Sequence, residues 1–172
     1  MSFISSAPIT LQYVVDINTT QQRAYEALET SSSWPHWFHG MTAASPIHED
    51  KTGRWREVTL SGFIHFREEF IAYEPPSHIA YRVAAVSLPY ADELVESFSI
   101  EPLKEGVRVT YRIGFRVHQS LRPLEFLIKR LGANAYRKSL HAFKAYLVSI
   151  EIYNSSPVLA TTSSGAIPKG FT

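Results

Sequence analysis

The stretch VRVTYRIGFRV (residues 107–117), followed by PLEFLIKRLGANAYRKSLHAFKAYLVSIEI (residues 123–152), decides the fold class of this chain. In the first part, apolar and aromatic residues alternate with polar or basic ones, which is typical of a strand with one covered and one solvent-facing side. In the second part, Pro123 occupies a favoured first helical position, and apolar residues then recur with helical spacing. The sequence therefore predicts a long C-terminal helix that covers an antiparallel sheet.

The predicted helix has a weak point and an unusual charge. Gly132, Ala133 and Asn134 could allow it to kink or to begin again. Residues 120–152 carry six Lys or Arg and two Glu, a net charge of +4, whereas residues 1–119 carry a net charge of −4. A solvated basic face is the simpler interpretation, and weak contact of this helix with anionic surfaces is the alternative.

The segments before the middle of the chain predict one strand and two short helices. Residues 9–17 alternate as a half-buried strand does. Thr19 and Thr20 offer an N-cap, and Gln22 completes a capping box with Thr19, for a helix over about residues 21–30. Residues 31–33 break this helix, and Trp34-Pro35 opens a second helical turn. From Met41 to about His118, glycines and prolines separate strand-like runs, which predicts a curved meander.

Composition favours one domain over residues 1–152 with a flexible tail over residues 153–172, which is rich in Ser, Thr, Gly and Pro. The absence of cysteine excludes disulfides and thiol chemistry and suits a cytoplasmic location. We expect no signal peptide, because the N-terminus lacks a basic segment followed by a long apolar one. We also expect no stable membrane insertion, because no run approaches about 18 uninterrupted apolar residues.

Five segments resemble the SRPBCC superfamily, the START-related, polyketide-cyclase-like group with the helix-grip fold: VDINTTQQRAYEAL (15–28), WPHWF (34–38), EPPSHIAYR (74–82), GVRVTYRIGF (106–115) and RKSLHAFKAYL (137–147). The resemblance spans about residues 9–150. It implies an α+β fold in which a curved antiparallel sheet of about seven strands wraps around the C-terminal helix, with two short helices after the first strand. No catalytic motif of the superfamily matches this chain residue by residue.

The resemblance also implies a cavity between the sheet and the long helix, and the aromatic inner face of the sheet agrees with it. The expected ligand-binding residues are Trp37, Phe38, Phe66, Phe70, Tyr81, Glu96, Phe98, Tyr111, Phe115, Tyr136 and Phe143. The expected ligand is a hydrophobic small molecule: a lipid, a quinone or a polyketide-like aromatic. The alternatives are that the aromatic side chains simply fill the core, or that the protein is a polyketide cyclase or dehydratase whose pocket supplies acid–base groups.

Three polar residues are candidates for such chemistry. Glu96 alternates in phase with apolar neighbours, so its carboxylate is expected to face inward, where desolvation would raise its pKa. The strand over residues 63–73 has apolar residues at both alternating sets of positions, so either set could face inward; we call these alternatives two phases. One phase turns Phe66 and Glu68 inward and the other turns His65 inward, and a bulge would mix them.

Other constellations predict no further site. His36 and His39 have a spacing that suits two ligands on one helical turn, but no third ligand is placed near them, so we expect no metal and no cofactor. Arg108, Arg112 and Arg116 form a basic strip on the solvent-facing side of a strand. Acidic neighbours on adjacent strands are expected to neutralise this strip, so we expect no nucleic-acid binding.

Overall fold

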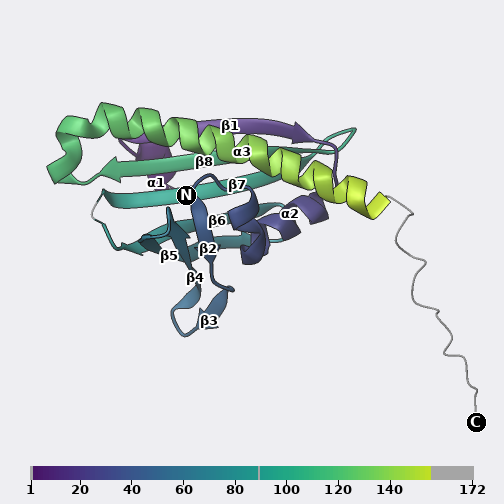
Figure 1. The fold of residues 1–172 in the computed structure, drawn as a ribbon, viewed down its shortest axis with the longest axis horizontal. Helices are drawn as coiled ribbons and strands as arrows, with labels where there is room; N and C mark the ends of the chain where they lie inside the picture. The colour runs from purple at the N-terminus through teal and green to yellow at the C-terminus, as the bar shows by residue number, and fades with distance from the viewer. Residues whose placement is uncertain (1, 89, 156–172) are drawn as a thin grey trace, which may run out of the picture.

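The computed structural model of the protein describes residues 2–88 and 90–155 (Figure 1). The helices are α1 (Ser2–Ser6), α2 (Gln21–Glu29), η1 (Ser31–His36), η2 (Gln119–Leu124) and α3 (Glu125–Ser155). The strands are β1 (Ile9–Ile17), β2 (Met41–Ala44), β3 (His48–Asp50), β4 (Gly53–Leu60), β5 (Ile64–Glu74), β6 (His78–Val86), β7 (Ala91–Pro102) and β8 (Val107–Val117). The tail is predicted to begin at residue 153. Residues 153–155 belong to α3, and the rest of the predicted tail lies outside the described residues.

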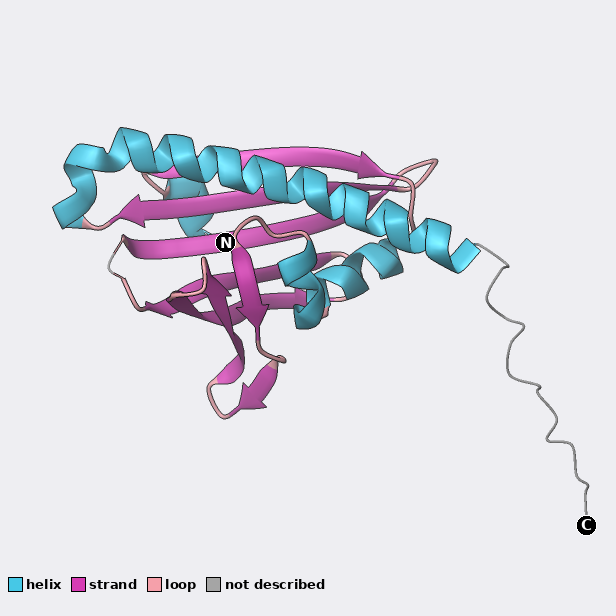
Figure 2. Cartoon of the chain, viewed as in Figure 1, coloured by secondary structure: helices cyan, strands magenta, loops and turns pink. Residues whose placement is uncertain are grey.

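The strands form one antiparallel sheet of eight strands in the order β1-β8-β7-β6-β5-β4-β2, and β3 pairs with β4. Figure 2 shows α3 lying across one face of this sheet, with α2 and η1 beside it. The predicted α+β helix-grip architecture is thereby confirmed. In β8 the predicted alternation is present, because Val109, Tyr111 and Ile113 are fully buried beneath α3 while Arg108 and Arg112 are exposed.

Helix α3 is continuous over Glu125–Ser155, so it does not begin again at Gly132–Asn134. A tertiary contact holds this segment, because the Tyr13 hydroxyl of β1 donates to the Ala133 carbonyl at 2.8 Å. Burial changes along the helix. Leu140 and Phe143 in its second half are buried, whereas Leu131 in its first half is 62% exposed. None of the helices in the described part of the chain is long and apolar enough to cross a bilayer.

The C-terminal half of α3 is also tied to the start of α2. Glu151 accepts a hydrogen bond from the Thr19 hydroxyl at 2.8 Å and forms an ion pair with Arg23. The predicted capping box is wrong in detail, because Thr20 is the N-cap of α2 and its hydroxyl accepts from the Arg23 backbone N–H at 3.2 Å. Thr19 is therefore free to hold α3, since it does not cap α2.

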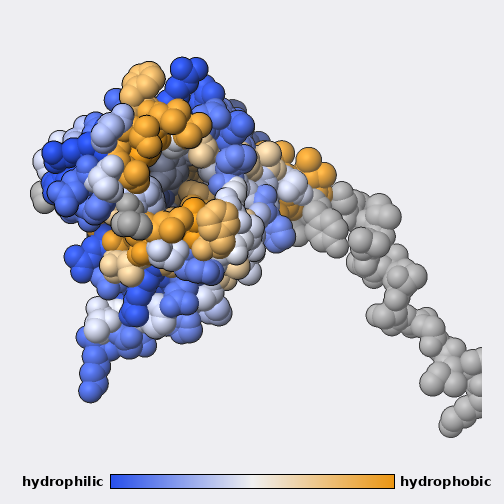
Figure 3. All heavy atoms as spheres, turned by 60° about the vertical axis from the view of Figure 1, so that its left-hand side comes forward, coloured by the Kyte–Doolittle hydropathy of each residue, from blue (hydrophilic) through white to orange (hydrophobic). Residues whose placement is uncertain are grey.

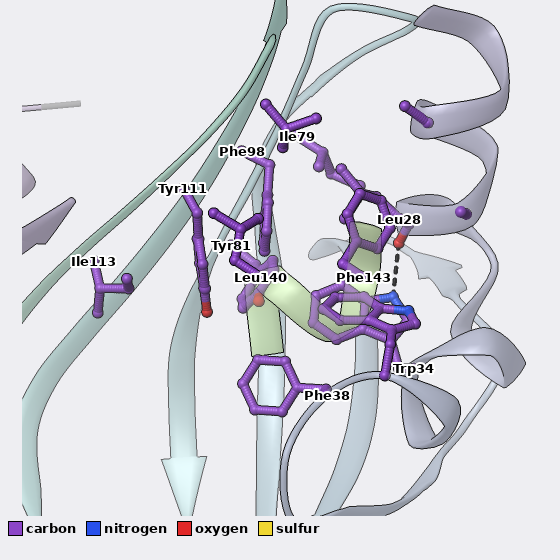
Figure 4. Close-up of a cluster of buried hydrophobic side chains, with 14 of the residues drawn as sticks. Leu28, Trp34, Phe38, Ile79, Tyr81, Phe98, Tyr111, Ile113, Leu140 and Phe143 are labelled. Atoms are coloured by element: carbon purple, nitrogen blue, oxygen red, sulfur yellow. Dashed lines mark hydrogen bonds between the residues drawn. The ribbon is translucent and has the colours of Figure 1, made fainter. Parts of the chain in front are cut away.

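Trp34 of η1 and the aromatic residues that directly follow η1 lie in the core between sheet and helices (Figure 4). Trp34 is fully buried and its indole N–H donates to the Leu28 carbonyl at 2.8 Å. The Trp37 ring lies 4.8 Å from that of Phe143 on α3. The segment expected only to break α2 instead forms the first half of η1, where the Ser33 hydroxyl donates to the carbonyl of residue 27 at 2.6 Å. This hydrogen bond lets the chain turn sharply and insert its tryptophans beneath the sheet.

The opposite face of the sheet is only partly exposed to solvent. Helix α1 packs against β8 at Gly114, where a Cβ atom would lie 2.8 Å from the Cα of Ile4. A larger residue at Gly114 would therefore displace α1. Along the same face, Arg108 forms an ion pair with Asp16 of the neighbouring strand at 2.8 Å, so the predicted cross-strand pairing of a strip arginine is present.

Candidate cavity between helix α3 and the sheet

A cavity of about 540 Å³ lies between the first half of α3 and strands β4–β7. Most of its lining is apolar: Phe38, Met41, Val58, Leu60, Ile64, Phe66, Val83, Leu94, Ile128, Leu131, Gly132 and Ala135. The remaining lining residues are polar: His39, Ser61, Glu68, Tyr90, Glu96 and Tyr136. The cavity thus combines a largely apolar wall with a small number of hydrogen-bonding groups, as binding sites for small molecules commonly do.

Exposed apolar side chains lie on segments that supply or adjoin the cavity lining. Leu124, Leu127 and Leu131 are exposed on η2 and α3, and Phe63 and Leu88 are exposed in the loops that precede the lining residues Ile64 and Tyr90. We call these five residues the apolar rim. Figure 3 shows hydrophobic surface on both sides of a hollow at this end of the molecule. An exposed apolar patch at a concave opening marks a place where apolar molecules can bind.

Four of the eleven predicted ligand-binding residues line the cavity: Phe38, Phe66, Glu96 and Tyr136. The other seven lie in the packed core beside it and not in the cavity wall: Trp37, Phe70, Tyr81, Phe98, Tyr111, Phe115 and Phe143. The reason is that Trp34 of η1 packs among these residues. Its Trp34 ring meets Tyr81 and Phe98 edge-on, with ring centroids 5.9 Å away in each case.

Strand β5 follows the phase that turns Phe66 and Glu68 inward, and its pairing with β6 shifts register at Arg67/Glu68 and between Phe70 and Ala72. Phe66 and Glu68 face inward and line the cavity. His65 is exposed on the other face, where its Nδ1 lies 3.1 Å from the Thr59 hydroxyl. His65 therefore does not line this cavity, so the expectation that it faces inward is wrong.

Glu96 is buried and is the centre of a tyrosine cluster. Its Oε2 accepts hydrogen bonds from the hydroxyls of Tyr81, at 2.8 Å, and Tyr111, and its Oε1 accepts from that of Tyr136 at 3.2 Å. Burial and the neighbouring Glu68 carboxylate raise the pKa of Glu96 to about 7, although the three hydroxyl donors favour its charged form. A carboxyl group with this pKa can both give and accept a proton near neutrality.

Glu68 forms a buried ion pair that sequence reasoning missed. Its Oε2 accepts from Arg56 Nε at 2.7 Å, and Arg56 is completely buried. The guanidinium carbon lies 3.9 Å from the centre of the Trp34 ring, a cation–π geometry. Within the described residues, Nη1 and Nη2 of Arg56 have no hydrogen-bond partner, so Glu68 is the principal counter-charge of this arginine. The cross-strand register Arg56↔Glu68 is what brings the two residues together.

Tyr90 completes the polar end of the cavity. Burial raises its pKa, and the Glu96 and Glu68 carboxylates raise it further, so the phenol remains protonated. Its ring packs edge-on against Phe66, with centroids 5.8 Å apart. Sequence reasoning missed Tyr90, because this residue belongs to no alternating run of apolar residues.

A second hollow of about 500 Å³ lies between α2 and the β3–β4 hairpin. It is lined largely by polar or small residues, among them Glu29, Glu49 and Arg54. It has no buried carboxylate comparable to Glu96, because both Glu29 and Glu49 reach solvent. The sheet–helix cavity is therefore the stronger candidate for a functional site.

Comparisons with known proteins agree with this architecture. An uncharacterized protein of Mycobacterium tuberculosis is 26% identical over 148 residues, which cover 85% of this chain and 89% of that protein. A START superfamily protein from Mycobacterium smegmatis superposes with a TM-score of 0.68 at 12% identity, over 82% of this chain and 98% of the other. The di-domain aromatase/cyclase StfQ from the steffimycin biosynthetic pathway superposes with a TM-score of 0.67 at 14% identity, over 83% of this chain and 52% of its own. The model of the polyketide cyclase/dehydrase and lipid transport family matches residues 8–148, so the chain belongs to that family.

Proposed function

We propose that the protein binds a hydrophobic small molecule, such as a lipid, a quinone or a polyketide-like aromatic, in the cavity beneath α3. The observation that carries this proposal is the apolar cavity of about 540 Å³ that opens at the apolar rim. Cavities of roughly 300–1,000 Å³ with apolar walls and few polar groups are the usual form of small-molecule sites. Burial of apolar ligand surface would supply most of the binding free energy, at about 25 cal/mol per Å².

Filling the cavity is expected to weaken ligand binding. Ala135 lies on the cavity-facing side of α3, so the side chain introduced by Ala135→Trp would occupy the space that a ligand needs. We expect this variant to bind a fluorescent apolar dye at least about tenfold more weakly than the unmodified protein, because one lost ligand methylene already costs about 0.8 kcal/mol. Fluorescence titration measures the change, and native mass spectrometry after gentle purification shows whether a copurified ligand is lost with it.

The matched control is Ala145→Trp, which adds the same indole to the exposed face of the same helix. Dye binding by this variant is expected to equal that of the unmodified protein. Retained dye binding in Ala135→Trp, with an unfolding midpoint close to that of the control, would count against this cavity as the ligand site.

A second candidate function is acid–base catalysis on such a ligand, as in a cyclase or dehydratase. The observation that favours it is Glu96, a cavity-lining carboxyl whose pKa is raised to about 7 and which three tyrosine hydroxyls hold in place. General acid–base groups with a pKa near the working pH contribute about 10²–10⁴-fold to rate. Turnover of an identified substrate should then fall by at least about a hundredfold in Glu96→Gln. Unchanged turnover in that variant would exclude Glu96 from the chemistry and leave binding as the function.

Two further predictions concern a second binding surface and the location of the protein in the cell. One is weak contact of the basic face of α3 with anionic surfaces, which the exposed side chains of Lys129 and Arg130 would make. The other is a cytoplasmic location, which rests on a sequence that contains no cysteine.

A further inference from the structure

The polar end of the cavity presents hydrogen-bond acceptors and negative charge to a ligand. Glu68 and Glu96 are both cavity-lining carboxyl residues. The cation that partners Glu68, Arg56, is fully buried and is not part of the cavity wall, so it balances the charge of Glu68 from behind. A ligand in the cavity therefore meets carboxylate oxygens and does not meet the guanidinium.

The hydroxyl donors near this wall are already used. Tyr81, Tyr111 and Tyr136 all donate to Glu96, and Tyr136 is the member of this group that reaches the cavity wall. Tyr90 adds one further phenol that can either donate or accept. The other hydroxyl of the cavity lining belongs to Ser61, which is exposed, so the wall that contains Glu68 and Glu96 is mainly an acceptor.

Apart from these carboxyl groups and phenols, the titratable side chain that lines the cavity among the described residues is His39. It is exposed and belongs to the segment that joins η1 to β2, at the edge of the cavity. The polar end formed by Glu68, Tyr90, Glu96 and Tyr136 is thus free of any cationic side chain in contact with a ligand. An anionic ligand group would lie beside like charges in a poorly solvated space, which is strongly unfavourable.

We propose that the cavity selects an apolar ligand whose polar end is an uncharged or cationic hydrogen-bond donor, namely a hydroxyl, a phenol or an amine, and that it discriminates against carboxylates. This inference rests on the proposed function, and it names the polar chemistry of the ligand. Fatty acids are thereby disfavoured among lipids, whereas alcohols, phenols and amines are favoured. Discrimination arises because the correct ligand donates to Glu68 or Glu96, while a carboxylate leaves these acceptors unpaired and repels them.

The test uses three ligands with one alkyl chain and different ends: decanol, decylamine and decanoate. Each is titrated at pH 8, below its micelle concentration, as a competitor of a bound apolar dye. Decanol or decylamine is expected to compete at a concentration at least about tenfold lower than decanoate, the discrimination typical of one mismatched polar group. The ranking of decanol against decylamine then shows whether a neutral or a cationic donor is preferred.

The outcomes separate this inference from the proposed function. Competition by decanoate at the same or lower concentration than both donors would overturn the inference while leaving hydrophobic binding intact. If the dye binds but none of the three ligands competes with it, the inference is overturned as well. If neither the dye nor any of the three ligands binds, both the inference and the proposed function are overturned.

A variant shows whether the carboxylates cause the discrimination. Glu96→Gln removes one negative charge at nearly constant shape, so the disadvantage of decanoate should shrink several-fold. Glu69→Gln is the matched control, because Glu69 lies next to Glu68 in β5 but forms its ion pair with Arg82 at 2.8 Å, away from the cavity. An identical decanoate-to-decanol ratio in Glu96→Gln, Glu69→Gln and the unmodified protein would also overturn the inference.

Discussion

Replacement of Arg56 by Met is expected to lower the free energy of unfolding by about 3–5 kcal/mol, the usual cost of removing one partner from a buried ion pair. Glu68 would lose its hydrogen bond from Arg56 Nε and would remain a carboxylate in a largely apolar wall. The Trp34 ring would also lose the guanidinium that lies over it at 3.9 Å. Urea unfolding followed by tryptophan fluorescence and by circular dichroism measures the loss.

Two further variants isolate the cause. Arg82→Met breaks an ion pair between the neighbouring strands β5 and β6 in which Arg82 is largely exposed, so at most about 1 kcal/mol is expected. The double variant Arg56→Met/Glu68→Leu removes both charges and is expected to recover most of the lost stability, because a buried pair can often be replaced by apolar residues at little cost. Equal losses in Arg56→Met and Arg82→Met would show that the buried pair has no special role.

The stability of the protein is expected to fall by about 3 kcal/mol between about pH 4.5 and pH 7, relative to Glu96→Gln. The reason is that the pKa of Glu96 is raised from 4.5 to about 7 in the folded protein. In this range the folded state keeps a proton that the unfolded state has lost, so the folded state is progressively disfavoured as the pH rises, by about 1.4 kcal/mol for each pH unit. The extra stability is complete below pH 4.5 and is lost above pH 7.

The groups that face Glu96 determine this behaviour. Tyr81, Tyr111 and Tyr136 donate to it, whereas the Glu68 carboxylate on the same sheet repels its charge. The measurement is a series of urea unfolding curves from pH 4 to pH 8 for the unmodified protein, for Glu96→Gln and for Glu93→Gln. Glu93 lies on the same strand with its side chain partly in solvent, and it supplies the baseline. A constant difference between the unmodified protein and Glu96→Gln over the whole range would contradict the raised pKa.

Much of the architecture could be predicted because its periodic signals are local. The alternation of β8 is regular over residues 107–117, since one face of that strand is covered along its length. Glu96 could be placed inward for the same reason, because Leu94 and Phe98 on either side of it share its phase and are buried. The long helix follows from its spacing, and the predicted break within it is absent because a contact with β1 holds the weak segment.

The division between core and cavity could not be predicted, because it depends on contacts between distant segments. Trp34 and Trp37 pack against Tyr81 and Phe143, which come from distant segments of the chain. Arg56 was overlooked for a related reason. An arginine in a strand is normally expected to face solvent, and only the register with Glu68 shows that its charge is compensated inside.

The uneven burial of α3 has a consequence for how the cavity is reached. Its second half is anchored by Leu140, Phe143 and the contacts of Glu151, whereas its first turns rest on few buried side chains. The free energy of local opening therefore increases along the helix from its first turn toward Leu140. We expect fraying of the first turns to widen the mouth of the cavity while the tryptophan core stays in place. The width of the mouth in this structure is then no upper limit on the size of a ligand. Amide hydrogens near Leu127 are expected to exchange with solvent well before those near Phe143.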